Sequence, residues 1–301
     1  AVRFSRLEQL AFAPDGALIV IDAGNAALRR ITDDLVVNTL LKGSPSINGL
    51  AFDPDGNIYT ASEVDSVVYR ITPNGQITIY AGVKGERGNA DGTAAQALFD
   101  VPRCVARDAA GNLFVGEYST IRKISPAGQV TTLSRAVTLA GYIDGPVANA
   151  TFRVPISMLV DPEGRLVFTE RDNHVVRMIS TQGIVSTLAG ASIQDGREDG
   201  VGTDARFFSP WDITVAPDGT VFVSDALAHT LRQITPAGVV STLAGGSVGA
   251  EDGTGRAAKF YTPTAIAVDL EGSLLVCDSD NHAIRRVTRS GVVTTYAGSL
   301  G

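Results

Sequence analysis

The chain has 301 residues, of which 44% are hydrophobic, and its formal net charge is −7. The acidic balance disfavours a nucleic-acid-binding surface. The absence of any run of about 18 apolar residues excludes a transmembrane helix, and two cysteines are too few for a disulfide framework. The sequence leaves the localisation open, and an extracytoplasmic location is the one we favour.

In chain order, the first predicted element is a tight turn that recurs six times. An arginine-bearing segment follows each turn, as in LRRIT (28–32), and a β-rich run such as GVVSTLAG (238–245) ends the unit. These short runs are rich in β-branched residues, alternate in polarity and are bounded by Gly, Asp and Pro, so each unit predicts four strands. The turn glycines are Gly16, Gly56, Gly111, Gly164, Gly219 and Gly272.

Six four-stranded units in tandem predict an all-β, six-bladed β-propeller with antiparallel blades. We expect one domain over residues 1–301, because no linker or shift in composition divides the chain. The predicted blades are 1–42, 43–82, 83–134, 135–190, 191–245 and 246–301.

A connector between blades also recurs, and it contains Asp-Gly, then a Phe, then a Pro. A glycine beside a carboxylate suits a phosphate or metal loop, but the Lys of a phosphate loop and the alternating acids of an EF-hand are missing. We expect the Asp to be the N-cap of a short helical turn that the Phe anchors. The second blade lacks the connector, which predicts a low point on that rim. The four aspartates are Asp91, Asp144, Asp199 and Asp252.

The segments DNHVVRMIS (172–180) and DNHAIRRVT (280–288), with the TLAG exits, resemble the NHL-repeat family of β-propellers. The resemblance covers all six units and implies the fold. It says little about function, because relatives include sensor, protein-binding and RNA-binding domains as well as lyases. The sequence starts inside a connector and ends at a fourth strand, so we expect the first and last blades to meet by side-chain packing alone.

An acid lies six residues after five of the turn glycines, and an Arg follows it. The second blade replaces both, with Ser62 and Tyr69. Their joint loss predicts a structural ion pair within each of the other blades, although a ring of acidic ligands is the alternative. The pairs are Asp22 with Arg29, Glu117 with Arg122, Glu170 with Arg177, Asp225 with Arg232, and Asp278 with Arg285.

The three histidines, His174, His229 and His282, hold one repeat position in successive blades. Three histidines suggest zinc, but equivalent points on adjacent blades lie too far apart for three imidazoles to converge to about 2 Å from one ion. We expect hydrogen bonds between blades instead.

The first two positions of the innermost strands differ from blade to blade, whereas deeper positions repeat. Such polar variety predicts a ligand site at the mouth of the central channel, with unconstrained variation of exposed residues as the alternative. Cys104 is open to two interpretations, a buried hydrophobe or a nucleophile. The candidate residues are Glu8, Gln9, Asn48, Arg103, Cys104, Ser157, Trp211 and Asp212.

Two functions fit these residues. The first is a non-catalytic binding, sensor or protein-interaction module without a cofactor, either monomeric or part of a larger protein, whose partner is a small molecule, glycan or peptide. The second is a divalent-metal-dependent hydrolase, since Glu8, Asn48 and Asp212 resemble the axial calcium ligands of six-bladed lactonases. However, Arg103 and Ile156 stand where that family needs neutral amides. We therefore lean away from an enzyme.

Overall fold

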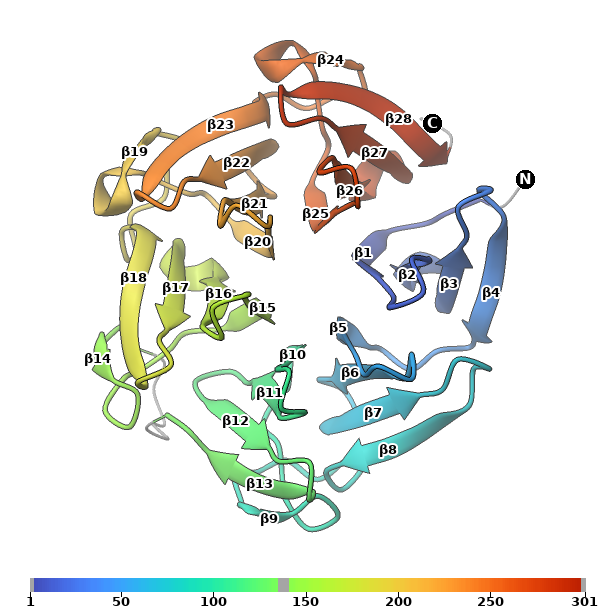
Figure 1. Cartoon of the computed structure of the whole chain (residues 1–301), viewed down its shortest axis with the longest axis vertical. Helices are drawn as coiled ribbons and strands as arrows, with labels where there is room; N and C mark the ends of the chain where they lie inside the picture. The colour runs from blue at the N-terminus through green and yellow to red at the C-terminus, as the bar shows by residue number, and fades with distance from the viewer. Residues whose placement is uncertain (1–2, 135–140, 299–301) are drawn as a thin grey trace.

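The computed structural model describes residues 3–134 and 141–298, and it shows six antiparallel sheets arranged as a ring around a central axis. The predicted six-bladed β-propeller is confirmed (Figure 1). The start predicted for the fourth blade, at residue 135, lies outside the described residues. In the described ranges no helix is long and apolar enough to cross a membrane.

Each blade runs from an innermost strand at the axis to an outer strand at the rim. Blade 1 contains β1 (Leu7–Phe12), β2 (Leu18–Asp22), β3 (Ala27–Ile31) and β4 (Val37–Lys42). Blade 2 contains β5 (Asn48–Phe52), β6 (Ile58–Ser62), β7 (Val67–Ile71) and β8 (Ile77–Ala81). Blade 3 contains β10 (Cys104–Arg107), β11 (Leu113–Gly116), β12 (Ile121–Ile124) and β13 (Gln129–Thr132). Blade 4 contains β15 (Pro155–Val160), β16 (Leu166–Glu170), β17 (Val175–Ile179) and β18 (Ile184–Gly190). Blade 5 contains β20 (Pro210–Val215), β21 (Val221–Asp225), β22 (Thr230–Ile234) and β23 (Val239–Gly245). Blade 6 contains β25 (Pro263–Val268), β26 (Leu274–Asp278), β27 (Ala283–Val287) and β28 (Val292–Gly298).

Blades 3 to 6 each carry a fifth, two-residue strand that the four-strand prediction missed. It comes from the connector and pairs antiparallel with the outermost strand of its own blade. Blade 2, whose connector is short, has four strands. The added strands are β9 (Gly92–Thr93), β14 (Gly145–Pro146), β19 (Gly200–Val201) and β24 (Gly253–Thr254). Single 3₁₀ turns occur at η1 (Ala23–Asn25), η2 (Arg171–Asn173), η3 (Gly202–Asp204), η4 (Gly255–Ala257) and η5 (Ser279–Asn281).

The hydrophobic core lies between blades, because both faces of each sheet meet a neighbour. Phe222 of blade 5, for example, shares a buried cluster with Phe260 and Val276 of blade 6. Four of the second strands, β2, β16, β21 and β26, are buried at every residue, including the acid at the end of each. Stacking of blades around the ring therefore supplies most of the burial.

Blades 1 and 6 close the ring without a shared strand in the described part of the chain. Leu10 and Val20 pack with Ala265 and Leu275 in one buried cluster. The Thr264 hydroxyl also donates to the Leu7 carbonyl at 2.9 Å. Side-chain packing closes the ring as expected, but it does not act alone, because hydrogen bonds also join blades 1 and 6.

The predicted ion pairs are confirmed, and they extend further than the sequence suggested. In blade 4, the fully buried Arg177 contacts Glu170 at 2.8 Å and the connector's Asp144 at 2.6 Å. Asp144 also accepts the backbone N–H of Thr187 at 2.9 Å. The connector, the inner acid and the outer strand are therefore fastened by one arginine. Blade 2 has lost all three parts together, and there the Tyr69 hydroxyl donates to Asp65 at 2.6 Å.

The expected N-cap role of the connector aspartate is wrong. In blade 5, the η3 turn begins after Val201, whose side chain makes no capping bond, and Asp199 instead contacts Arg232 at 2.8 Å. An unpaired buried guanidinium costs more free energy than an uncapped exposed turn, so the aspartate pairs with the arginine. The connector Phe is an anchor as expected, since Phe207 is fully buried with its ring centroid 5.1 Å from the Arg232 guanidinium carbon.

The three histidines bond to the following blade, as predicted. His174 Nδ1 lies 2.8 Å from the Phe208 carbonyl oxygen. His229 and His282 accept the backbone N–H groups of Thr262 and Arg6 at 3.2 and 3.3 Å. The last of these bonds spans the ring closure.

Candidate functional site

The innermost strands β1, β15 and β20 begin with a β-bulge that separates their first two side chains. In β20 the register skips from Pro210 to Asp212, so Trp211 is the bulged residue. The same skip leaves Glu8 out of the ladder in β1. A bulge re-aims one side chain while the next one keeps its place in the pleat. The predicted site residues are consequently divided between two levels.

The upper level is a cavity of about 500 Å³ at the mouth. Four predicted residues line it: Glu8, Asn48, Arg103 and Trp211. The short connector of blade 2, residues 44–47, forms part of its wall. The cavity is therefore built on the side of the ring where the blade 2 connector is short.

Three arginines line the mouth cavity, and each is paired with an acid. Arg6 lies 3.0 Å from Glu8, and Arg103 lies 3.0 Å from Glu63. Arg171 lies 2.8 Å from Asp172, and its guanidinium carbon lies 5.6 Å from the centroid of the Trp211 ring. Each of the three mouth arginines thus has one acidic partner. The Arg103–Glu63 pair joins the innermost strand region of blade 3 to the loop after β6 of blade 2.

Glu8 is partly buried, and its surroundings have opposing effects on the pKa of its carboxyl group. Burial raises the pKa of the Glu8 carboxyl above its ordinary value, the neighbouring Arg6 lowers that pKa, and the nearby Glu63 carboxylate raises it. Carboxylates of blades 1 and 2 therefore face one another closely enough to interact across the mouth.

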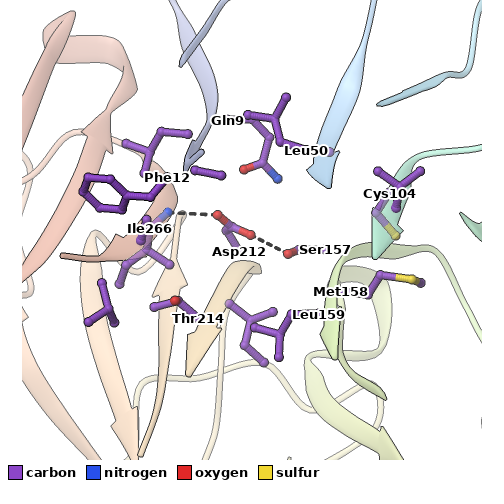
Figure 2. Close-up of a pocket in the computed structure, with 17 residues that line it drawn as sticks. Gln9, Phe12, Leu50, Cys104, Ser157, Met158, Leu159, Asp212, Thr214 and Ile266 are labelled. Atoms are coloured by element: carbon purple, nitrogen blue, oxygen red, sulfur yellow. Dashed lines mark hydrogen bonds between the residues drawn. The ribbon is translucent and has the colours of Figure 1, made fainter. Parts of the chain in front are cut away.

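The lower level is a cavity of about 230 Å³ within the channel, lined by Gln9, Cys104, Ser157 and Asp212 among apolar residues (Figure 2). These four were expected at the mouth, and this expectation is corrected. Gln9, Ser157 and Asp212 follow the bulges of their strands, Cys104 begins β10, and all four residues line the cavity below the mouth. A narrow space that shares Gln9 with the lower cavity and Trp211 with the upper one lies between the two levels.

Asp212 ties blades together around the axis. Its carboxylate accepts hydrogen bonds from the Ser157 hydroxyl of blade 4, from the Ile266 N–H of blade 6 at 2.9 Å, and from the Gln9 side chain of blade 1. Burial raises the pKa of Asp212 to about 6, although these hydrogen bonds act in the opposite direction. Asp212 therefore has a structural role, because it links blades. The variability of this position among the six repeats had suggested a ligand-binding role instead.

Cys104 is a buried hydrophobe in this structure. It is 1% exposed, its Sγ lies 3.4 Å from the Pro155 carbonyl oxygen, and burial raises the pKa of its thiol. A thiol held in its protonated form is a poor nucleophile. Cys277 is equally buried, in β26.

The residues of the metal alternative do not form one ligand set. Glu8 lines the upper cavity, whereas Asp212 lines the lower one with its oxygens already engaged by protein donors. In residues 3–134 and 141–298 no three His, Cys, Asp or Glu side chains gather as metal ligands. Glu8 and Asn48 therefore share the upper cavity, and Asp212 lies in the lower one.

Sequence reasoning missed Arg6, Glu63 and Arg171 at the mouth. Glu63 and Arg171 directly follow the repeated acid position, in the loops between the second and third strands. The six residues at this position are Ala23, Glu63, Tyr118, Arg171, Ala226 and Ser279. The residue type at this position varies among the blades, as it does at the start of the innermost strands. A comparison of the repeats at this position would therefore have found Glu63 and Arg171.

Comparison with known proteins gives distant matches over the propeller. Human Teneurin-4 is 23% identical over 282 residues, which cover 81% of this chain and 10% of Teneurin-4. The structure of an auxiliary nutrient binding protein from Bacteroides ovatus matches with a TM-score of 0.75 and 19% identity, covering 98% of this chain and 70% of that one. A chain of a nidogen/laminin complex matches with a TM-score of 0.63 and 18% identity, covering 90% of both. No known family profile matches the chain.

These likenesses, together with the repeated motifs, support a β-propeller of NHL type. The chain spans about a tenth of the length of the teneurins it matches. At such identities the solved structures establish the fold alone.

Proposed function

We propose that this propeller is a non-catalytic binding module that recognises a ligand in the mouth cavity. The observation that carries the proposal is the cavity of about 500 Å³ where the blade 2 connector is short. Its volume lies within the roughly 300–1,000 Å³ of ordinary small-molecule sites. Its lining combines a partly exposed Trp211 with the polar groups of Asn48, Glu63 and Arg103.

The chemistry of the described residues favours binding over catalysis. Cys104 is protonated and buried, and Asp212 lies below the mouth with protein partners on its carboxylate. The mouth carboxylates Glu8 and Glu63 each lie 3.0 Å from an arginine. A small molecule, a glycan or a peptide end fits a cavity of this size.

Trp211 is the only tryptophan in the chain, so its fluorescence reports directly on the mouth. We expect a saturable change in emission when the intact protein is titrated with a panel of small molecules, glycans and short peptides. Calorimetry with Trp211→Ala should then show affinity for the responding compound reduced about tenfold or more, a loss typical of an aromatic anchor.

Leu270→Ala is the matched control. Leu270 is fully exposed in the turn after β25, at the end opposite the mouth. Equal loss of affinity in both variants, or no response to any compound in the panel, would show that the mouth cavity is not a ligand site.

A further inference from the structure

The mouth cavity combines full charge pairing with a polar lining. Arg6 and Arg103 each lie 3.0 Å from a glutamate, and Arg171 lies 2.8 Å from Asp172. A ligand carrying a net charge would have to compete with one member of an existing pair and leave the other without its partner. Such an unpaired, partly desolvated charge is unfavourable. The lining therefore selects against charged ligands.

A hydroxyl group suits these pairs because it donates one hydrogen bond and accepts others. In the Arg103–Glu63 pair, guanidinium donors and carboxylate acceptors lie side by side, so two neighbouring hydroxyls can bond both without separating them. Arg103 Nε is also buried with no hydrogen-bond partner among the described residues. The Asn48 amide supplies one more donor and one more acceptor on the same wall.

Trp211 provides the apolar part of the lining. The Arg171 guanidinium carbon lies 5.6 Å from the centroid of the indole, and Ala23, Pro45 and Ile47 add apolar lining from blades 1 and 2. A flat aromatic face buries an apolar ring face efficiently and costs little side-chain entropy. A ring that has C–H groups on one face and hydroxyls around its edge matches both parts of this cavity.

We propose that the mouth cavity binds an uncharged polyhydroxylated ring, that is, a neutral sugar. This proposal rests on the proposed binding function and specifies its ligand class. Glu63 and Arg103 bind the hydroxyls as a pair, Asn48 adds a further polar contact, and Trp211 covers the ring face.

The test compares glucose, galactose and mannose, as methyl glycosides and as disaccharides, with the uronate and the 2-amino sugar that correspond to each. Binding is measured by Trp211 fluorescence and by calorimetry on the intact protein. At least one neutral sugar should bind, and its charged counterpart should bind about tenfold more weakly, because one misplaced charge-assisted bond has that effect.

Glu63→Gln gives the second arm of the test. It leaves Arg103 without its carboxylate, so the ratio of glucuronate affinity to neutral-sugar affinity should rise about fivefold or more, while Leu270→Ala should leave this ratio unchanged. Thermal unfolding of Glu63→Gln checks that the variant is folded.

Three results would overturn the sugar proposal. Charged sugars that bind the unmodified protein as well as neutral ones would contradict the pairing argument. An unchanged ratio in folded Glu63→Gln would remove Glu63 from the site. Peptides or other small molecules that bind when no sugar does would exclude the sugar class and leave the binding function intact. Absence of binding by every class of compound would reject both the binding function and the sugar proposal.

Discussion

Replacement of Arg177 by Met should destabilise the protein severely although Arg177 does not line the mouth cavity. The arginine is fully buried and donates to Glu170 at 2.8 Å, to Asp144 at 2.6 Å and to the Thr151 and Ile143 carbonyls at 2.8 and 2.7 Å. Met fills much of the same space but provides no donor. Glu170, itself fully buried, then keeps Asn173 as its side-chain partner.

The magnitude follows from which partner is left behind. Removal of one member of a buried ion pair costs about 3–5 kcal/mol, mostly because the remaining charge stays desolvated. Asp144 is 39% exposed in its side chain and regains water, so it adds little. We therefore expect the free energy of unfolding to fall by about 3–5 kcal/mol, a large share of the roughly 5–15 kcal/mol of an ordinary domain.

The assay is urea-induced unfolding followed by circular dichroism at pH 7. Arg289→Met is the matched control, because the Arg289–Asp218 pair is exposed and should contribute under about 1 kcal/mol. The double variant Glu170→Ser with Arg177→Tyr carries the residues of blade 2 at these two positions, places the Tyr near Asn173 as an acceptor, and should recover at least half of the loss. A loss below about 1 kcal/mol for Arg177→Met, or no recovery in the double variant, would refute the buried-pair reasoning.

Three further predictions concern the axis. Because burial raises the pKa of Asp212 from 3.8 to about 6, its contribution to stability is complete below pH 4 and is lost as pH rises through 6. Asp212→Asn should gain about 3 kcal/mol relative to the unmodified protein between pH 4 and pH 7.5 in urea titrations, at about 1.4 kcal/mol per pKa unit, and a constant difference would contradict the shift. Gly49→Ala should cost about 1–2 kcal/mol or more in the same assay, because Gly49 has a φ of +73° and an added Cβ would lie 2.9 Å from the Val105 nitrogen; a neutral result would show that β5 can move. Thermal unfolding with and without EDTA, together with metal analysis, tests the hydrolase alternative, and we expect no change in Tm; a fall in Tm and a co-purified divalent ion would revive it.

Comparison of the repeats with one another predicted much of the scaffold. Recurrence in the blades was enough to predict structural roles for residues such as Arg177 and His174. The connector aspartate shows the limit of this approach. Asp144 was expected to cap a turn, and its actual partner is a buried guanidinium 33 residues away in the chain. Local capping preferences carry no information about such a distant donor.

The sequence by itself determined the number of blades, their antiparallel strands and the pairing of acids with arginines, because these follow from local periodicity and from repetition. Only the tertiary structure decided how the variable residues divide. A bulge one residue long turns Trp211 to the mouth and Asp212 to the axis, and ring closure brings Glu63 to Arg103. Those relations depend on packing between blades, to which residues far apart in the chain contribute, and so the site is a property of the closed ring.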